Sequence, residues 1–223
     1  MKTEINGIET YFEWWLLEMQ SSGYIKSFER ETEVFLVAPI AEYGRYKRFK
    51  RKEKEIEAFA LFPKIEYSYD YKIYWNKEAE YLFYEEINES EIFQFGRPVF
   101  VAHKNKHEQT DENDDYPIVS YVDVKPTNSV QRKGGKVSSS ITFPLKNRIL
   151  WDRSRIYINK VVPMPMSGTG FKSALFIKTF TPQRYLLTDG GKQLRKIKYP
   201  VTTMLAYVNK QKTEIETLLK NTI

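Results

Sequence analysis

A carboxylate and an ammonium group stand two positions apart in an otherwise apolar stretch, IVSYVDVKPT, residues 118–127. Asp123 and Lys125 are separated by Val124, and successive side chains of a β-strand point to opposite faces. The two charged groups are therefore predicted to share one face of a strand. Such a pair marks either a solvated edge strand, where lysine is common, or half of an active site.

Other acidic residues of the chain favour an active site. Glu9 lies near the start of a predicted helix, and Asp70 lies on another predicted strand. Carboxylate oxygens are ligands that Mg²⁺ and Mn²⁺ prefer, and phosphodiester hydrolysis needs an activated water and charge neutralisation at phosphorus. Two or three carboxylates would hold the metal, while Lys125 would orient the water or stabilise the developing charge. These residue types predict metal-dependent phosphodiester hydrolysis.

Composition restricts the other classes of function. The 223 residues are 41% hydrophobic, which suffices for a core, and the absence of cysteine excludes disulfides and cysteine nucleophiles. Only two histidines are present, which argues against a His-rich metal site or a Ser-His-Asp triad. The formal charge of +6 favours an anionic partner. No apolar run is long enough to span a membrane, and no signal peptide is recognisable, so we expect a cytoplasmic protein without membrane contact.

Apolar periodicity predicts a mixed α/β fold. A first helix is expected within residues 7–25, where apolar residues recur at helical spacing and a Ser-Ser-Gly sequence supplies the stop. Alternating patterns predict strands over 25–37, 64–75 and 155–162, the last preceded by a short turn or helix. The final residues, 201–223, have the pattern of an amphipathic helix. Strands mixed with helices in this order predict a mixed α/β domain with additional elements.

With these pieces in place, the sequence resembles the PD-(D/E)XK nuclease superfamily, whose pattern is a helix-borne glutamate, an aspartate and an acid-x-lysine strand. The likeness is closest to small phage-encoded endonucleases, in which the glutamate is followed by Leu at +7, Gly at +14 and Ile at +16. Counted from Glu9, the matching residues are Leu16, Gly23 and Ile25. The resemblance covers roughly residues 5–163. Tyr69 departs from it, because the family has a proline before the first aspartate.

The resemblance implies a restriction-endonuclease-like fold, with a mixed β-sheet flanked by helices. Mg²⁺ or Mn²⁺ would be held by Asp70, Asp123 and the carbonyl of Val124, with Glu9 as a direct or water-mediated ligand. If the chain is phage-encoded, like the enzymes it resembles, it would act in the host cytoplasm, and cleavage would leave 5′-phosphates. Glu13 competes with Glu9, since it lies one helical turn away on the same face.

The family pattern also predicts how the chain is divided. The span from Asp70 to Asp123 is longer than in the family, so an insertion is expected at about 76–117. We therefore expect a nuclease core over 1–163. A C-terminal extension over 164–223, with a hairpin and the final helix, would be packed on that core.

Basic residues predict the surface that contacts nucleic acid. The run RYKRFKRKEKE, residues 45–55, interleaves aromatic rings that stack on bases with cations that hold phosphates; its alternative is a solvated hairpin arm. The expected contacts are Arg45, Lys47, Arg48, Lys50, Arg51, Lys146, Arg148, Arg195 and Lys196. The sequence thus predicts a DNA endonuclease. Two alternatives stay open: a Holliday-junction or branched-DNA resolvase, normally a homodimer, and a non-catalytic nucleic-acid-binding protein of the same fold.

Overall fold

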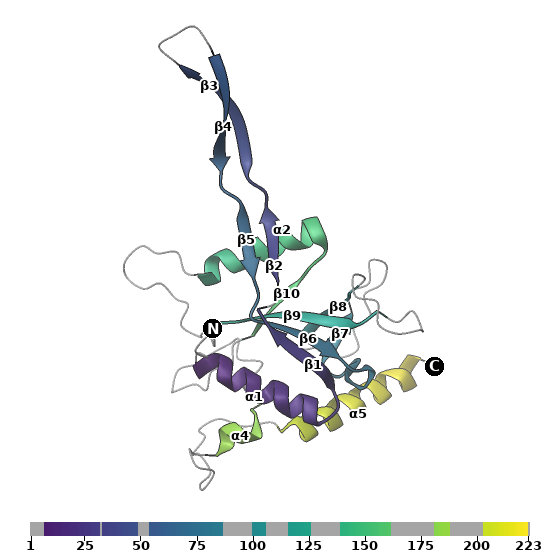
Figure 1. The fold of residues 1–223 in the computed structure, drawn as a ribbon. Coiled ribbons are helices and arrows are strands. Elements are labelled where there is room, and N and C mark those ends of the chain that lie inside the picture. Colours follow the sequence, from purple (N-terminus) through teal and green to yellow (C-terminus); the bar gives the residue numbers. More distant parts are fainter. Residues whose placement is uncertain are drawn as a thin grey trace.

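The computed structural model describes residues 7–31, 33–48, 54–86, 100–105, 116–125, 139–161, 181–187 and 203–222. These residues form a central mixed sheet with helices on both faces, from which a long two-stranded arm projects (Figure 1). The predicted mixed sheet flanked by helices is confirmed at this level. The predicted C-terminal hairpin lies outside the described residues, as does much of the expected insertion.

The central sheet has the strand order β1-β6-β9-β8-β7, and β10 pairs with β9 as a sixth strand. The strands are β1 (Ile25–Arg30), β6 (Tyr71–Trp75), β7 (Tyr84–Glu86), β8 (Phe100–Lys104), β9 (Ile118–Val124) and β10 (Ile158–Val161). β1, β6 and β9 are antiparallel neighbours, whereas β10 runs parallel to β9. β9 is flanked by β6 on one side and by β8 and β10 on the other. Its interior position rules out the solvated-edge interpretation of Asp123 and Lys125.

Helices α1 (Gly7–Ser21) and α5 (Met204–Thr222) cover one face of the sheet (Figure 1). The apolar residues at helical spacing form the buried side of α1, and they are Phe12, Trp15, Leu16 and Met19. They pack in one core with Ile73 and Val122 of the sheet and with Tyr207 of α5. Burying each large side chain contributes about 1.5–3 kcal/mol. α1 ends as predicted, and Gly23 turns the chain into β1 with a φ of +80°, which suits glycine.

Helix α2 (Ser139–Ser154) covers the opposite face (Figure 1). Its Phe143 and Leu150 pack with Val119 and Tyr121 of β9. The side chains of β9 therefore alternate between the two cores, and Asp123 belongs by alternation to the α2 face. The short turn or helix predicted before β10 is a helix of 16 residues. Two shorter elements complete the described helices, η1 (Lys77–Ala79) and α4 (Gln183–Leu186).

The arm consists of β2 (Val34–Ala38), β3 (Ala41–Arg48), β4 (Lys54–Phe62) and β5 (Ile65–Ser68). β2 pairs with β5 at its base, and β3 pairs with β4 farther out, all antiparallel. The single strands predicted over 25–37 and 64–75 are therefore wrong, because each is divided between the sheet and the arm. The chain leaves the sheet at Glu31, whose φ of 43° is left-handed and breaks the strand. It returns through a bend at Asp70.

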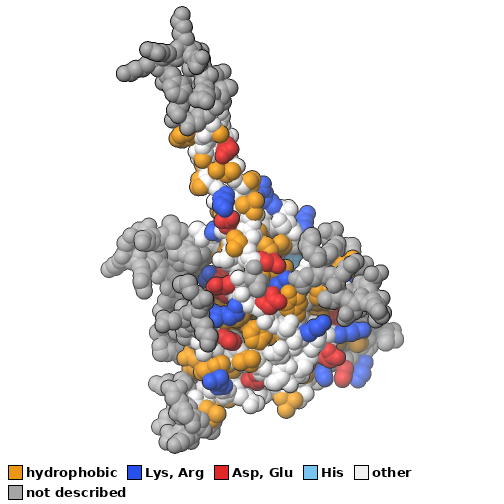
Figure 2. Space-filling model, in the orientation of Figure 1, with side chains coloured by type: hydrophobic (Ala, Val, Ile, Leu, Met, Phe, Trp, Pro, Cys, Tyr) orange, Lys and Arg blue, Asp and Glu red, His pale blue; other side chains and the backbone are white. Residues whose placement is uncertain are grey.

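The shaft of the arm is apolar rather than basic. Its exposed large hydrophobic residues are Val34, Leu36, Ile40, Tyr43, Phe59, Leu61, Phe62 and Ile65. Figure 2 shows hydrophobic side chains along this shaft, above a body where acidic and basic side chains mix. A two-stranded ribbon alone is marginally stable in water, so its base needs support. Val37 and Tyr67 provide it by packing in the core beneath α2.

Candidate active site

Asp123 and Lys125 meet at the end of β9, on the face predicted from strand alternation. Lys125 Nζ lies 2.6 Å from Asp123 Oδ1, and the Asp123 side chain is only 1% exposed. The backbone N–H of Lys125 donates to the carbonyl of Val161 at 2.8 Å, so β10 fixes this strand end. A carboxylate this deeply buried is costly unless it is paired and hydrogen-bonded. The pairing with Lys125 meets that requirement and gives the site a cation.

Asp70 lies in the bend between β5 and β6. Its backbone N–H donates to the carbonyl of Val122 at 2.9 Å, and its carbonyl accepts from the N–H of Glu31 at 3.2 Å. Its Oδ2 accepts a further hydrogen bond from the N–H of Val124 at 2.6 Å. The bend is thus tied to β9 and to the end of β1, which holds the Asp70 carboxylate at the same strand end as Asp123.

The two aspartates interact directly. Burial raises the pKa of Asp70 to about 7; the hydrogen bond from Val124 opposes the shift, and the charge of Asp123 and a hydrogen bond with it add to it. Two carboxylates in contact cannot both ionise without cost, so they share a proton or require a cation between them. The arrangement is one that a divalent ion would relieve.

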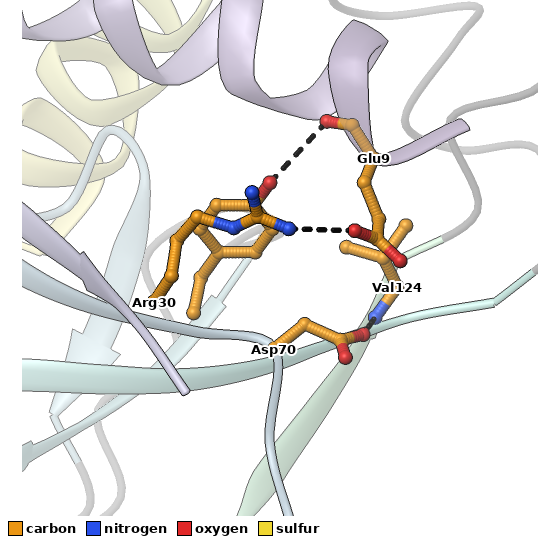
Figure 3. A network of polar contacts seen from close by, with 5 residues as sticks. Glu9, Arg30, Asp70 and Val124 are labelled. Atoms are coloured by element: carbon orange, nitrogen blue, oxygen red, sulfur yellow. Dashed lines mark hydrogen bonds and ion pairs between the residues drawn. The ribbon is translucent and has the colours of Figure 1, made fainter. Parts of the chain in front are cut away.

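Glu9 approaches the same strand end from α1 (Figure 3). Its Oε2 lies 2.7 Å from Arg30 Nη2, and the Arg30 guanidinium lies 5.3 Å from the centre of the Tyr71 ring. The side chain of Glu9 points down from the helix toward Val124 and Asp70 (Figure 3). Burial raises the pKa of Glu9, while Arg30 opposes the shift. Glu9 is therefore held by Arg30 and points toward Asp70 and Val124 from the α1 side of the sheet.

Glu13, the competing helix acid, has a different environment. Its Oε2 is buried and has no hydrogen-bond partner in the described part of the chain. Its negative charge contributes to the raised pKa values of Glu9 and Tyr71. Arg30 forms its ion pair with Glu9, and Glu13 lies one turn farther along α1.

Two residues at the site were not singled out from the sequence. Arg30 pairs with Glu9, and the Tyr67 hydroxyl donates a hydrogen bond to Asp123 Oδ2. Burial, followed by the negative charges of Asp123 and Asp70, raises the pKa of Tyr67 above its usual range, so the hydroxyl stays protonated and donates. The signals in the sequence were a tyrosine three positions before Asp70 and an arginine placed between Glu29 and Glu31.

The acids at this strand end supply part of the ligand set of a divalent metal ion. Among the residues that the structure describes, no three His, Asp or Glu side chains form a group able to hold a metal by themselves. Asp70 and Asp123 nevertheless offer a pair of carboxylates in contact. Mg²⁺ is commonly bound by one or two carboxylates together with waters and substrate phosphates. The pair therefore fits Mg²⁺ or Mn²⁺, and the resemblance implies the carbonyl of Val124 and Glu9 as further oxygen donors.

The predicted nucleic-acid contacts are dispersed. Lys146 of α2 donates to the carbonyl of Glu66 at 3.3 Å, and Arg148 pairs with Asp152 at 2.9 Å on the helix surface. Arg45, Lys47 and Arg48 belong to β3 of the arm, as the hairpin interpretation predicted. The residues Lys50, Arg51, Arg195 and Lys196 lie outside the described part of the chain. The basic run therefore starts beyond the apolar shaft, toward the tip of the arm.

The register of β3 with β4 places Arg45 opposite Glu57 and Lys47 opposite Glu55.

None of the helices in the described ranges is long and apolar enough to cross a membrane. Comparison of the chain with protein-family models, curated proteins and solved structures returns no match.

Proposed function

We propose that this protein is a Mg²⁺-dependent DNA endonuclease that hydrolyses phosphodiester bonds. The observation that carries the proposal is the convergence of Asp70, Asp123 and Lys125 at one end of an interior strand. Three ionisable groups, one of them 1% exposed, are brought together from two distant segments. A partly buried acid whose pKa is strongly raised, as that of Asp70 is, is typical of functional sites.

Stability alone is a poor explanation for this cluster. Removing charges from water is expensive, and apolar residues of similar size often serve a core as well or better. The Asp70 carboxylate makes the arrangement less favourable still, since it is a second negative charge beside Asp123. Asp70 and Asp123 lower the stability of the folded protein when no cation is bound. A role in binding a cation explains why both are present.

Asp70 and Asp123 would hold Mg²⁺, with the carbonyl of Val124 as a further ligand and Glu9 as a direct or water-mediated one. The ion would lower the pKa of a water and neutralise charge at phosphorus. Lys125 lies 2.6 Å from Asp123 and is 19% exposed, so its ammonium group is held beside the metal ligands yet reachable by a substrate phosphate. It would orient the attacking water or stabilise the negative charge that develops in the transition state.

The order of the elements supports the same proposal. α1 carries Glu9, the antiparallel strands β1, β6 and β9 follow, and then α2 leads to β10, which is parallel to β9. This agrees with the motif order of the resemblance, in which a helix-borne glutamate precedes the acidic strands and a turn and final strand follow the lysine. We infer a restriction-endonuclease-like core into which the arm is inserted between β1 and β6.

Two alternatives remain relevant to the substrate and the chemistry. A Holliday-junction or branched-DNA resolvase would use the same site, normally as a homodimer. A non-catalytic DNA-binding protein would share the basic residues but would have no need of converged acids. A cysteine-free chain acting on DNA with Mg²⁺ is expected in the cytoplasm, that of the host if it is phage-encoded.

The experiment is a cleavage assay on duplex, four-way-junction and single-stranded DNA with Mg²⁺. The wild type should cut at least one of the three, and Asp123→Asn should not cut while binding the same DNA as well or better, because a repulsive charge has been removed. Cleavage by the variant at the wild-type rate would refute the assignment of the site. A preference for the junction would favour the resolvase, and binding without cleavage by the wild type would favour the non-catalytic alternative.

A further inference from the structure

Tyr67 is a neutral side chain that makes direct contact with the acidic pair. Its hydroxyl donates a hydrogen bond to Asp123 Oδ2, while Lys125 approaches the other oxygen, Oδ1. The whole residue is 9% exposed, and it is the single buried position of β5. Both oxygens of Asp123 thus have a partner, one charged and one neutral, and the plane of the carboxylate is fixed.

The ring of Tyr67 is held from two sides. It packs edge-on against Phe143 of α2, with ring centres 6.1 Å apart, and Lys146 Nζ lies 5.5 Å from its centre. Lys146 also donates a hydrogen bond to the carbonyl of Glu66, so two residues of α2 hold β5, the strand that carries Tyr67. A hydroxyl held by packing on a rigid helix makes a well-aimed donor.

We propose that Tyr67 is a positioning residue of the metal site, which sets the orientation of Asp123 through its hydroxyl. The inference rests on the proposed function and extends it to a residue at the base of the arm. Groups that hydrogen-bond to metal ligands fix their orientation, and their loss typically costs 10- to 100-fold in metal affinity or activity. Tyr67 and Lys125 together fix both oxygens of Asp123 beside Asp70, the other acid proposed to hold the cation.

The position of Tyr67 also ties the site to the arm. Asp70 follows it three positions later in the chain, and β5 pairs with β2 through the register of Tyr67 with Phe35. The base of the arm therefore supplies both an orienting hydroxyl and, just beyond β5, one of the two acids. Disturbing the base of the arm is expected to affect metal binding even though the arm projects away from the sheet.

The test compares Tyr67→Phe with Tyr207→Phe in the full chain. Tyr207 is a matched control, since its hydroxyl is also buried and donates one hydrogen bond, to the carbonyl of Leu82 at 3.1 Å, within the α5 core. Mn²⁺ binding is measured by electron paramagnetic resonance without DNA, cleavage is measured against Mg²⁺ concentration, and thermal unfolding is recorded for all three proteins. Tyr67→Phe should bind Mn²⁺ about 10- to 100-fold more weakly and need correspondingly more Mg²⁺ for cleavage. Tyr207→Phe should match the wild type in Mn²⁺ affinity and in the Mg²⁺ concentration needed for cleavage. Like Tyr67→Phe, it should lose some thermal stability.

Two results would overturn the inference while leaving the proposed function intact. One is wild-type Mn²⁺ affinity in Tyr67→Phe, in a wild type that binds Mn²⁺ and cuts DNA. The other is an equal loss of affinity in both variants, which would reduce the effect to general destabilisation. A wild type that neither binds Mn²⁺ nor cuts DNA would overturn the proposed function and this inference together.

Discussion

Replacing Asp70 by asparagine should stabilise the metal-free protein. Asparagine retains an oxygen that accepts the hydrogen bond from the N–H of Val124, but it removes the negative charge beside Asp123. The pKa of Asp70 is raised from 3.8 to about 7 in the fold, and each unit corresponds to about 1.36 kcal/mol, or roughly 4 kcal/mol for a group shielded from water. Because Asp70 is only partly buried, solvent screening lowers the expected gain to on the order of 1–2 kcal/mol.

The pH dependence has a defined sign. Between its unfolded and folded pKa values, Asp70 binds a proton in the folded protein but not in the unfolded chain, so wild-type stability falls as the pH rises through this window. Asp70→Asn lacks this carboxylate, so its stability does not fall in this pH window. The difference in free energy of unfolding between the variant and the wild type should therefore be small at about pH 4 and reach its full size at about pH 8. At this chain length 1 kcal/mol corresponds to roughly 2–4 °C in Tm.

The assay is urea and thermal unfolding of Asp70→Asn and wild type in EDTA at both pH values, repeated with Mg²⁺. Mg²⁺ should stabilise the wild type more than the variant, since it binds the folded site with both carboxylates present. Asp152→Asn is the control, because this exposed acid of α2 pairs with Arg148 and should change stability by less than about 0.5 kcal/mol. A variant less stable than wild type at the higher pH in EDTA would refute the cost assigned to the ionised Asp70 carboxylate, which arises first from its burial and then from its repulsion with Asp123.

Three further predictions follow from the site and the arm. Glu9→Gln should lower single-turnover cleavage by about a hundredfold or more, whereas Glu13→Gln should cost much less; the opposite order would move the site to Glu13. Cleavage should require Mg²⁺ or Mn²⁺, be poorly supported by the larger Ca²⁺ and vanish in EDTA; full activity in EDTA would exclude the mechanism. Replacing the basic residues of the arm by serine should weaken DNA binding and lower the log–log salt slope by roughly 0.9 for each duplex phosphate that the protein no longer neutralises. The substituted residues are Arg45, Lys47, Arg48, Lys50 and Arg51. An unchanged slope would show that these basic residues form a solvated surface and do not contact DNA phosphates.

Helix periodicity predicted α1 well, because one apolar stripe at helical spacing faces the core and the chain ends the helix at a Ser-Ser-Gly sequence. α2 was underestimated for a local reason. Pro144 lies within it, and proline normally interrupts a helix, so the pattern there predicted no more than a short turn or helix. Packing of Phe143 and Leu150 against the sheet offsets that local penalty.

The arm could not be predicted from alternation alone. Apolar and polar residues alternate on both sides of Glu31 and again on both sides of Asp70, so alternation gives no sign of the two points at which the chain leaves the sheet and returns. Each break depends on backbone geometry and on non-local hydrogen bonds, such as that from the N–H of Glu31 to the carbonyl of Asp70. Such hydrogen bonds join segments far apart in the sequence, which periodicity does not register.

The site was predictable to the extent that its chemistry is local. A period of two places Asp123 and Lys125 on one face, and the structure joins them at 2.6 Å. Tyr67 was missed because its hydrogen bond to Asp123 spans 56 positions and depends on how the arm rejoins the sheet. The pairing of Glu9 with Arg30 spans 21 positions and likewise needed the tertiary structure.

The most direct test of the metal site is a crystal structure of the protein soaked in Mn²⁺, with the ion located by its anomalous scattering. We predict a peak in contact with carboxylate oxygens of both Asp70 and Asp123, at about 2.0–2.2 Å as hard divalent ions of this size require, and no such peak in Asp123→Asn. A fully soaked crystal with no peak between these two aspartates, or with ions bound only elsewhere, would contradict it.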